Sequence, residues 1–120
     1  MLNKYLLTET GIRPWGTWEC ICVGEKYIVK RIVVNPQSSL SLQSHNHRHE
    51  HWFIVDGTAT ITIDDKKITC SRYESVDIPM QSKHRMGNMT DKPVVFIEIQ
   101  TGDIFDENDI IRYEDIYNRV

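Results

Sequence analysis

Short runs of β-branched and aromatic residues recur along most of the chain and are separated by turn signals. They fall at residues 26–34, 39–45, 52–55, 58–63, 67–70, 75–78 and 94–100. Asp56-Gly57 is a turn dipeptide, Asp64 to Lys66 marks another turn, and Pro79 ends the run before it. This pattern is typical of an all-β sandwich or small barrel. Only the tail, Glu107 to Asn118, has helical composition, so we expect one short C-terminal helix.

The composition fits one ordinary globular domain. The chain has 120 residues, is 40% hydrophobic and carries a formal net charge of -3. We therefore expect a single domain over residues 1–120 and no nucleic-acid partner. Because no apolar run approaches a membrane span and the N-terminus lacks the features of a signal peptide, we expect no membrane partner and a cytoplasmic location. The odd cysteine count (Cys20, Cys22 and Cys70) favours reduced thiols over a disulfide framework.

Four of the five histidines lie in one stretch, LQSHNHRHEHWFIVDG, from Leu42 to Gly57. These histidines are His45, His47, His49 and His51. On an unbroken strand all four would share one face and Glu50 would point the other way. The stretch is then a flat surface patch that binds metal adventitiously, or a solvated loop without metal. A built site that uses both His45 and Glu50 needs a bend between them.

The strand expected over Ser39 to His45, which overlaps the start of this stretch, has an unusual polarity. In SLSLQSH, Leu40 and Leu42 share one face, and Ser41, Gln43 and His45 share the other. If the polar face lines a cavity, the two leucines need cover from the N-terminal segment or from a second subunit. We therefore expect a homodimer.

The spacing resembles the two sequence motifs of the cupin fold. Gln43 and His45 lie two apart, Glu50 follows after five positions, and Gly57 follows seven later. The second motif is PMQSKHRMGN, from Pro79 to Asn88, in which Gln81 replaces the usual glycine. Gln43 itself stands where most cupins have the first histidine. The resemblance implies a jelly-roll double-stranded β-helix, with a bend across Asn46 to His49 that lets Glu50 face the cavity.

The cupin resemblance also implies a metal site. The implied ligands are Gln43, His45, Glu50 and His84. Two imidazole nitrogens and two oxygens suit a divalent ion, zinc first and manganese, cobalt or nickel as alternatives.

Six segments, in order, resemble the type II phosphomannose isomerase domain. They are RPWGTW, YIVKRIVVNP, LSLQSHNHRHEHWFIVDGTATIT, IPMQSKHRMGN, FIEIQTGD and ENDIIRYEDIYNR. This cupin domain forms the C-terminal part of bifunctional mannose-6-phosphate isomerase/mannose-1-phosphate guanylyltransferases in many bacteria. Asn46 and His49 depart from the family's HHHRAEHW, and no nucleotidyltransferase segment is present, so a stand-alone domain is expected. The resemblance implies a metal-dependent isomerase that interconverts mannose 6-phosphate and fructose 6-phosphate.

Such a reaction moves a proton between C1 and C2 of the open-chain sugar through an enediol. It needs an electrophile, a base and a phosphate clamp. We predict that Arg48 is catalytic, since it matches the motif arginine, and name His47 and Lys30 as candidate bases. The candidates for substrate binding are Arg85, Arg31 and Arg13.

Two other functions compete with the isomerase. One is a non-catalytic sugar-phosphate-binding module that has lost its base. The other is an iron-dependent oxygenase, which Gln43 disfavours because such enzymes prefer a histidine-rich ligand set.

Overall fold

A computed structural model describes residues 9–105 and 109–114 of the chain, and these residues form twelve β-strands. The strands are β1 (Thr10–Arg13), β2 (Gly16–Val23), β3 (Tyr27–Val34), β4 (Ser38–Ser39), β5 (Leu42–His45), β6 (Arg48–Asp56), β7 (Thr58–Ile63), β8 (Lys66–Ser71), β9 (Ser75–Ile78), β10 (His84–Asn88), β11 (Val94–Gly102) and β12 (Ile110–Glu114). None of the described residues belongs to a helix long and apolar enough to cross a membrane.

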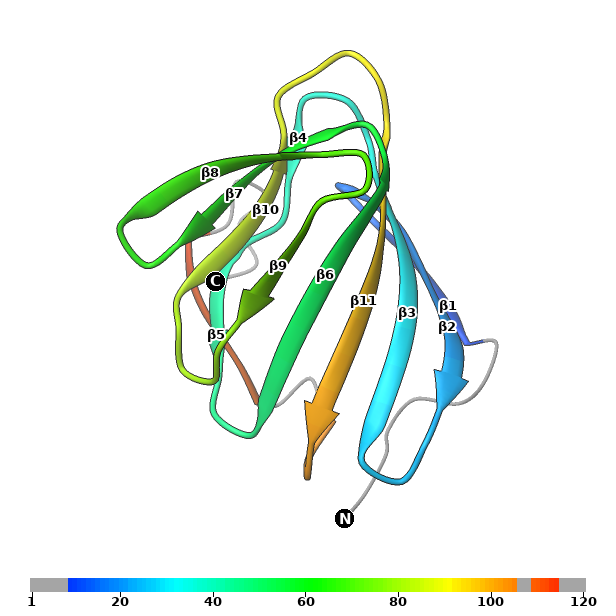
Figure 1. Cartoon of the computed structure of the whole chain (residues 1–120), viewed down its shortest axis with the longest axis vertical. Helices are drawn as coiled ribbons and strands as arrows, with labels where there is room; N and C mark the ends of the chain where they lie inside the picture. Colours follow the sequence, from blue (N-terminus) through cyan, green and yellow to red (C-terminus); the bar gives the residue numbers. More distant parts are fainter. Residues whose placement is uncertain (1–8, 106–108, 115–120) are drawn as a thin grey trace.

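The strands form two antiparallel sheets that face each other (Figure 1). The first has the order β1-β2-β3-β11-β6-β9, and the second has the order β12-β5-β10-β7-β8, with β4 also paired to β10. The chain passes between the sheets repeatedly, so strands distant in sequence, such as β3 and β11, become neighbours. The all-β prediction is confirmed.

Alternation of side chains decides which residues reach the space between the sheets. Along β6, Arg48, Glu50 and Trp52 are buried, whereas Phe53 is exposed. The turn after β6 needs Gly57, whose φ of 86° lies in the left-handed region. A Cβ there would also lie 2.5 Å from the Pro93 carbonyl oxygen.

The interior between the sheets has an apolar part and a polar part. Ile28, Ile54, Ile61 and Phe96 are fully buried and belong to one hydrophobic core. A second set of buried residues is polar or charged, and it includes Lys30, Arg48, Glu50, Glu98 and Gln100. Buried charges are rare in proteins unless they are paired or bind a ligand. The polar part is therefore the place to look for a functional site.

The predicted C-terminal helix is wrong over the residues that the structure describes. Residues 110–114 form β12, which pairs with β5 and places Ile110 opposite His45 and Arg112 opposite Gln43. Helical composition is a weak preference, and the hydrogen-bonding edge of β5 overrides it here. Residues 107, 108 and 115–118 of the predicted helix lie outside the described residues.

The strand predicted over Ser39 to His45 is interrupted at Leu40 and Ser41. The Leu40 N–H donates to the Met86 carbonyl, so the chain crosses here from β4 to β5. The interruption breaks the alternation, and Leu40 lines the polar pocket together with Gln43. The expectation that Leu40 points away from the cavity is therefore wrong.

Candidate metal centre and active site

A bend between β5 and β6 resolves the alternation of the four histidines. His45 ends β5, Asn46 and His47 form the bend, and β6 begins at Arg48. The bend changes which face each side chain occupies. His45 and Glu50 consequently both point into the interior, as a shared site requires.

Three buried side chains from three strands converge beyond this bend. The ligand atoms of His45, Glu50 and His84 all lie within 4.8 Å of one another. The two imidazole rings have centroids 4.8 Å apart. Imidazole nitrogens and a carboxylate are ordinary ligands of divalent metals, so this cluster can hold a metal ion.

The donor atoms of the cluster also fit an ion electronically. Burial lowers the pKa of His45 to about 3 and also lowers the pKa of His84. Both imidazoles are therefore neutral at pH 7, as metal ligation demands. Burial raises the pKa of the Glu50 carboxyl, but His45, which is protonated at the low pH where this carboxyl titrates, and the Arg48 guanidinium more than offset this and hold its pKa below the ordinary value. Glu50 is thus a carboxylate.

Gln43 supplies a fourth candidate ligand atom, its amide oxygen, at the edge of the cluster. Its amide N–H donates to the Ser41 hydroxyl at 2.9 Å, which turns Oε1 toward His45. Oε1 lies 3.1 Å from His45 Nε2, and that nitrogen already accepts a hydrogen bond from Arg48. Two acceptor atoms this close repel each other unless a cation lies beside both. The arrangement therefore suits a shared cation.

In this structure the cation beside these atoms is the guanidinium of Arg48. Its Nη2 lies 2.8 Å from His45 Nε2, and its Nε donates to Glu50 Oε2 at 3.0 Å. The lone pair on His45 Nε2 can accept one hydrogen bond or bind one metal ion, but not both at once. A metal ion that uses His45 Nε2 must therefore displace the Arg48 guanidinium.

Neighbouring groups fix the orientation of the other ligands. Trp52 Nε1 donates to Glu50 Oε1 at 2.9 Å, and the Trp52 ring meets the His84 ring edge-on at 5.6 Å. His84 Nδ1 lies 3.0 Å from the Ser82 carbonyl oxygen, so Nδ1 carries the proton and Nε2 keeps its lone pair. Such outer contacts orient the ligands of metal sites.

The turn before His84 forms although Gln81 replaces the glycine of the motif. Gln81 has a φ of 67°, which is the left-handed conformation that glycine adopts most easily. Its N–H donates to the His45 carbonyl at 2.7 Å. The turn of the second motif is thus tied directly to the bend of the first.

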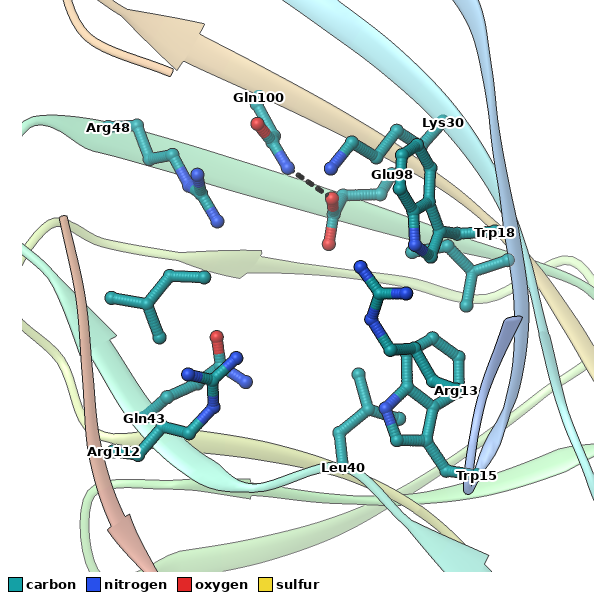
Figure 2. A pocket seen from close by; sticks show the side chains of 12 residues that line it. Arg13, Trp15, Trp18, Lys30, Leu40, Gln43, Arg48, Glu98, Gln100 and Arg112 are labelled. Carbon is teal, nitrogen blue, oxygen red and sulfur yellow. Dashed lines mark hydrogen bonds between the residues drawn. The ribbon is translucent and has the colours of Figure 1, made fainter. Parts of the chain in front are cut away.

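A pocket of about 80 Å³ adjoins the cluster and is strongly cationic. Its lining includes Arg13, Lys30, Arg48 and Arg112, together with Trp15 and Trp18. Figure 2 shows Arg13 and Arg112 reaching into the pocket from opposite sides. Several cations beside aromatic rings suit a small anionic ligand with a carbon skeleton.

Lys30 and Glu98 form a titratable pair in the wall of this pocket. Burial lowers the pKa of Lys30 to about 8, and its Nζ lies 4.7 Å from the centroid of the Trp18 ring. Burial and the nearby Glu50 carboxylate raise the pKa of Glu98 to about 7, and Gln100 donates a hydrogen bond to Glu98 Oε1 (Figure 2). Both groups can therefore change protonation near neutral pH.

The structure brings most of the predicted site residues together. Gln43, Arg48, Lys30 and Arg13 line the pocket, and His45, Glu50 and His84 form the cluster beside it.

Three predicted site residues do not line this pocket. His47 is 53% exposed on the bend, with Nε2 4.0 Å from Asp109 Oδ1, and Arg31 is exposed on the outer face of β3. Arg85 borders a smaller adjoining cavity of about 30 Å³, but its guanidinium pairs with Glu114 at 3.4 Å. Neither His47 nor Arg31 lines the pocket, because Arg31 follows the inward-facing Lys30 on β3 and His47 lies beside Asn46 on the exposed bend.

Three polar pocket residues were absent from the sequence prediction. Glu98 and Gln100 are the inward polar positions of β11, and their alternation with Ile97 and Ile99 was the available signal. Arg112 was assigned to a helix, which concealed its alignment with Gln43.

Comparison with known proteins places the chain in a family. A family model described as mannose-6-phosphate isomerase C-terminal matches residues 3–115. The chain belongs to this family. The family resemblance seen in the sequence is thereby confirmed.

Two curated relatives show how the family domain occurs in longer proteins. Alginate biosynthesis protein AlgA of Pseudomonas aeruginosa is 45% identical over 107 residues, which cover 89% of this chain and 22% of that protein. Mannose-1-phosphate guanylyltransferase ManC of Salmonella typhimurium is 44% identical over 108 residues, which cover 90% of this chain and 22% of that protein. The chain thus spans less than a quarter of the length of these family members.

A solved structure supports the fold of this family member. An uncharacterized conserved protein with a double-stranded β-helix domain from Klebsiella pneumoniae superposes with a TM-score of 0.73 at 13% identity. The match covers 87% of this chain and 91% of that chain. The predicted cupin double-stranded β-helix is confirmed.

Proposed function

We propose that the chain is a metal-dependent isomerase that interconverts mannose 6-phosphate and fructose 6-phosphate. The observation that carries the proposal is that the metal cluster adjoins a cationic pocket. Glu50 and His84 of the cluster line the smaller cavity, and that cavity shares Gln43, Arg48 and Glu98 with the cationic pocket. Family membership supports the same reaction. Gln43, which lines the pocket and contacts His45, joins the two features.

The ligand set supports a divalent ion held by Gln43, His45, Glu50 and His84. Two neutral imidazoles, one amide oxygen and one carboxylate leave a doubly charged ion with net positive charge. Zinc fits this set first, and manganese, cobalt or nickel are alternatives. When bound, the ion acts as a Lewis acid toward the oxygens at C1 and C2 of the sugar.

The cationic walls of the pocket supply the contacts for the phosphate group. Arg13 and Arg112 extend from the edge strands β1 and β12 toward the pocket between them (Figure 2). An arginine fork matches phosphate oxygens in a bidentate fashion. With the phosphate held at this end, C1 and C2 lie toward Arg48 and the metal ligands.

Glu98 is the group best placed to carry the proton between the two carbons. Among the described residues that line the pocket, it is the one carboxylate outside the metal ligands. Glu98 takes the proton from C2 of open-chain mannose 6-phosphate and returns it to C1, while the hydroxyl proton on O2 passes to O1, which gives fructose 6-phosphate. Its pKa of about 7 suits both directions of this transfer. Lys30 beside it stabilises the carboxylate form and can contact the substrate.

A coupled assay of mannose 6-phosphate turnover tests the proposal. We expect no turnover by metal-stripped protein, recovery with zinc or manganese, and loss of more than about a hundredfold in His84→Ala. His51→Ala is the matched control, because His51 lies on the outer face of β6 and pairs with Asp77 at 2.6 Å. This variant should keep activity.

Two results would contradict the isomerase. Absence of turnover with every divalent metal, combined with retained binding of mannose 6-phosphate, would indicate a non-catalytic sugar-phosphate-binding module. Full activity in His84→Ala would rule out the ligand set.

A further inference from the structure

The bend between β5 and β6 contains no metal ligand, yet it sets the separation of two of them. His45 precedes the bend directly, and Glu50 follows it by three positions. Any change in the backbone of Asn46 and His47 moves these two side chains relative to each other. What holds the bend therefore matters for the metal centre.

One carboxylate on a distant part of the chain holds this bend. Asp109 accepts the N–H of Asn46 through Oδ1 at 3.2 Å and the N–H of His47 through Oδ2 at 3.0 Å. Asp109 is 9% exposed and immediately precedes β12, in which Ile110 pairs with His45. Both carboxylate oxygens are thus engaged by consecutive amides of the bend.

Two further contacts restrict the backbone position of the bend. The His45 carbonyl accepts the N–H of Gln81 at 2.7 Å. On another side, Gly102 lies so close that a Cβ there would be 2.3 Å from the His47 carbonyl oxygen. Asp109 is the contact made by a side chain, so it can be changed without rebuilding the backbone.

We propose that Asp109 is a positioning residue for the metal centre, because its carboxylate fixes the bend that lets His45 and Glu50 reach one ion. The inference rests on the metal site of the proposed function. Hydrogen bonds from two backbone amides to a charged carboxylate are strong, and without them two amides lose their acceptor. The ligand atoms then lose their alignment, as happens when an orienting partner is removed from a metal site.

The test compares metal binding by wild type, Asp109→Asn and Asp109→Ala. Asparagine keeps one acceptor oxygen for one of the two amides, whereas alanine keeps none. Zinc or manganese is titrated into metal-stripped protein below its unfolding temperature, and tryptophan fluorescence is followed. Trp52 reports binding because it donates to Glu50 and contacts the His84 ring.

A matched control removes a hydrogen bond of the same kind elsewhere. Glu74 Oε1 accepts the Ser71 N–H at 2.7 Å in the turn between β8 and β9, which contains no metal ligand. Glu74→Ala should therefore bind metal as wild type does.

We expect the dissociation constant to rise by about tenfold to a hundredfold in Asp109→Ala, with Asp109→Asn intermediate. If Asp109→Ala does not fold, the comparison of Asp109→Asn with Glu74→Ala decides the question. A lower Tm with unchanged metal affinity would overturn the positioning role and leave an ordinary stabilising contact. Failure of wild type itself to bind zinc or manganese would overturn the metal centre and, with it, this role.

Discussion

At the scale of single residues, the interior of this protein is organised around Arg48. It is buried and donates hydrogen bonds to His45 and Glu50, two of the three clustered ligands. In the absence of an ion, the guanidinium compensates the buried Glu50 carboxylate. The same guanidinium competes with any ion that uses these atoms. In this structure Arg48 is therefore the charge partner of Glu50, and we expect metal binding to displace its guanidinium.

Substitution of Arg48 by methionine tests this dual role. We expect the metal-free protein to lose about 3–5 kcal/mol of stability, because a buried carboxylate loses its partner. Zinc should then raise the Tm of Arg48→Met more than that of wild type, since the ion compensates Glu50 without a competitor. Thermal unfolding with and without zinc measures the difference.

Arg85→Met is the control, because Arg85 pairs with Glu114 rather than with a metal ligand. A zinc-induced rise in Tm for Arg48→Met that equals or falls below that of wild type would show that Arg48 does not compete with the ion.

How far the site could be predicted also differs from residue to residue. The resemblance to the cupin motifs sufficed to name His45, Glu50 and His84, which the structure brings together, because motif spacing reflects local turns and strand pairing. The exposure of His47 did not follow from the sequence, because His47 lies on a bend whose amides are held by Asp109, and Asp109 lies far away in the chain. Glu98 was missed for a similar reason, since only the pairing of β11 with β3 and β6 brings it to the pocket.

At the scale of elements, β12 connects the candidate metal centre with the pocket. It pairs with β5, follows Asp109 directly and carries Ile110 and Arg112 into the pocket lining. Tyr113 OH lies 2.9 Å from the Ser44 hydroxyl and adds a further contact between the two strands. The composition of this segment favours a helix, but pairing with β5 satisfies its backbone and decides its structure. Tertiary context of this kind is not visible in local composition.

Arg112 gives the prediction that belongs to this element. Its Nε is buried and has no hydrogen-bond partner among the described residues, and its side chain lines the pocket. We expect Arg112→Ala to raise KM for mannose 6-phosphate by about tenfold or more, since a charged hydrogen bond to phosphate is lost. The value of kcat should change much less, because the metal ligands and Glu98 are untouched.

Steady-state kinetics of Arg112→Ala and Arg31→Ala make the comparison. Arg31 is exposed on the outer face of β3, so its removal takes away the same charge without touching the pocket. Equal KM values for the two variants would exclude a substrate contact by Arg112.

At the scale of the whole molecule, the strand positions could be predicted well and the closure of the barrel could not. Thr58–Ile63 and Ser75–Ile78 form strands with the predicted bounds, because turn residues mark both ends. The order of strands within each sheet depends on long-range pairing, which no local pattern specifies. The expected homodimer stays a prediction. It was argued from Leu40 and Leu42 needing cover outside the cavity, and Leu40 lines the pocket instead.

The central claim is that one buried ion, held beside the pocket, makes this chain an isomerase. The most direct measurement titrates zinc or manganese into metal-stripped protein and follows mannose 6-phosphate isomerisation at each ratio. The account predicts that activity rises in proportion to added metal and saturates at one ion per chain. The same curve is expected for a His49→Ala/His51→Ala variant, whose lost imidazoles lie on the outer face of β6. Activity that is independent of metal, absent at every ratio, or abolished by removing these outer histidines would contradict it.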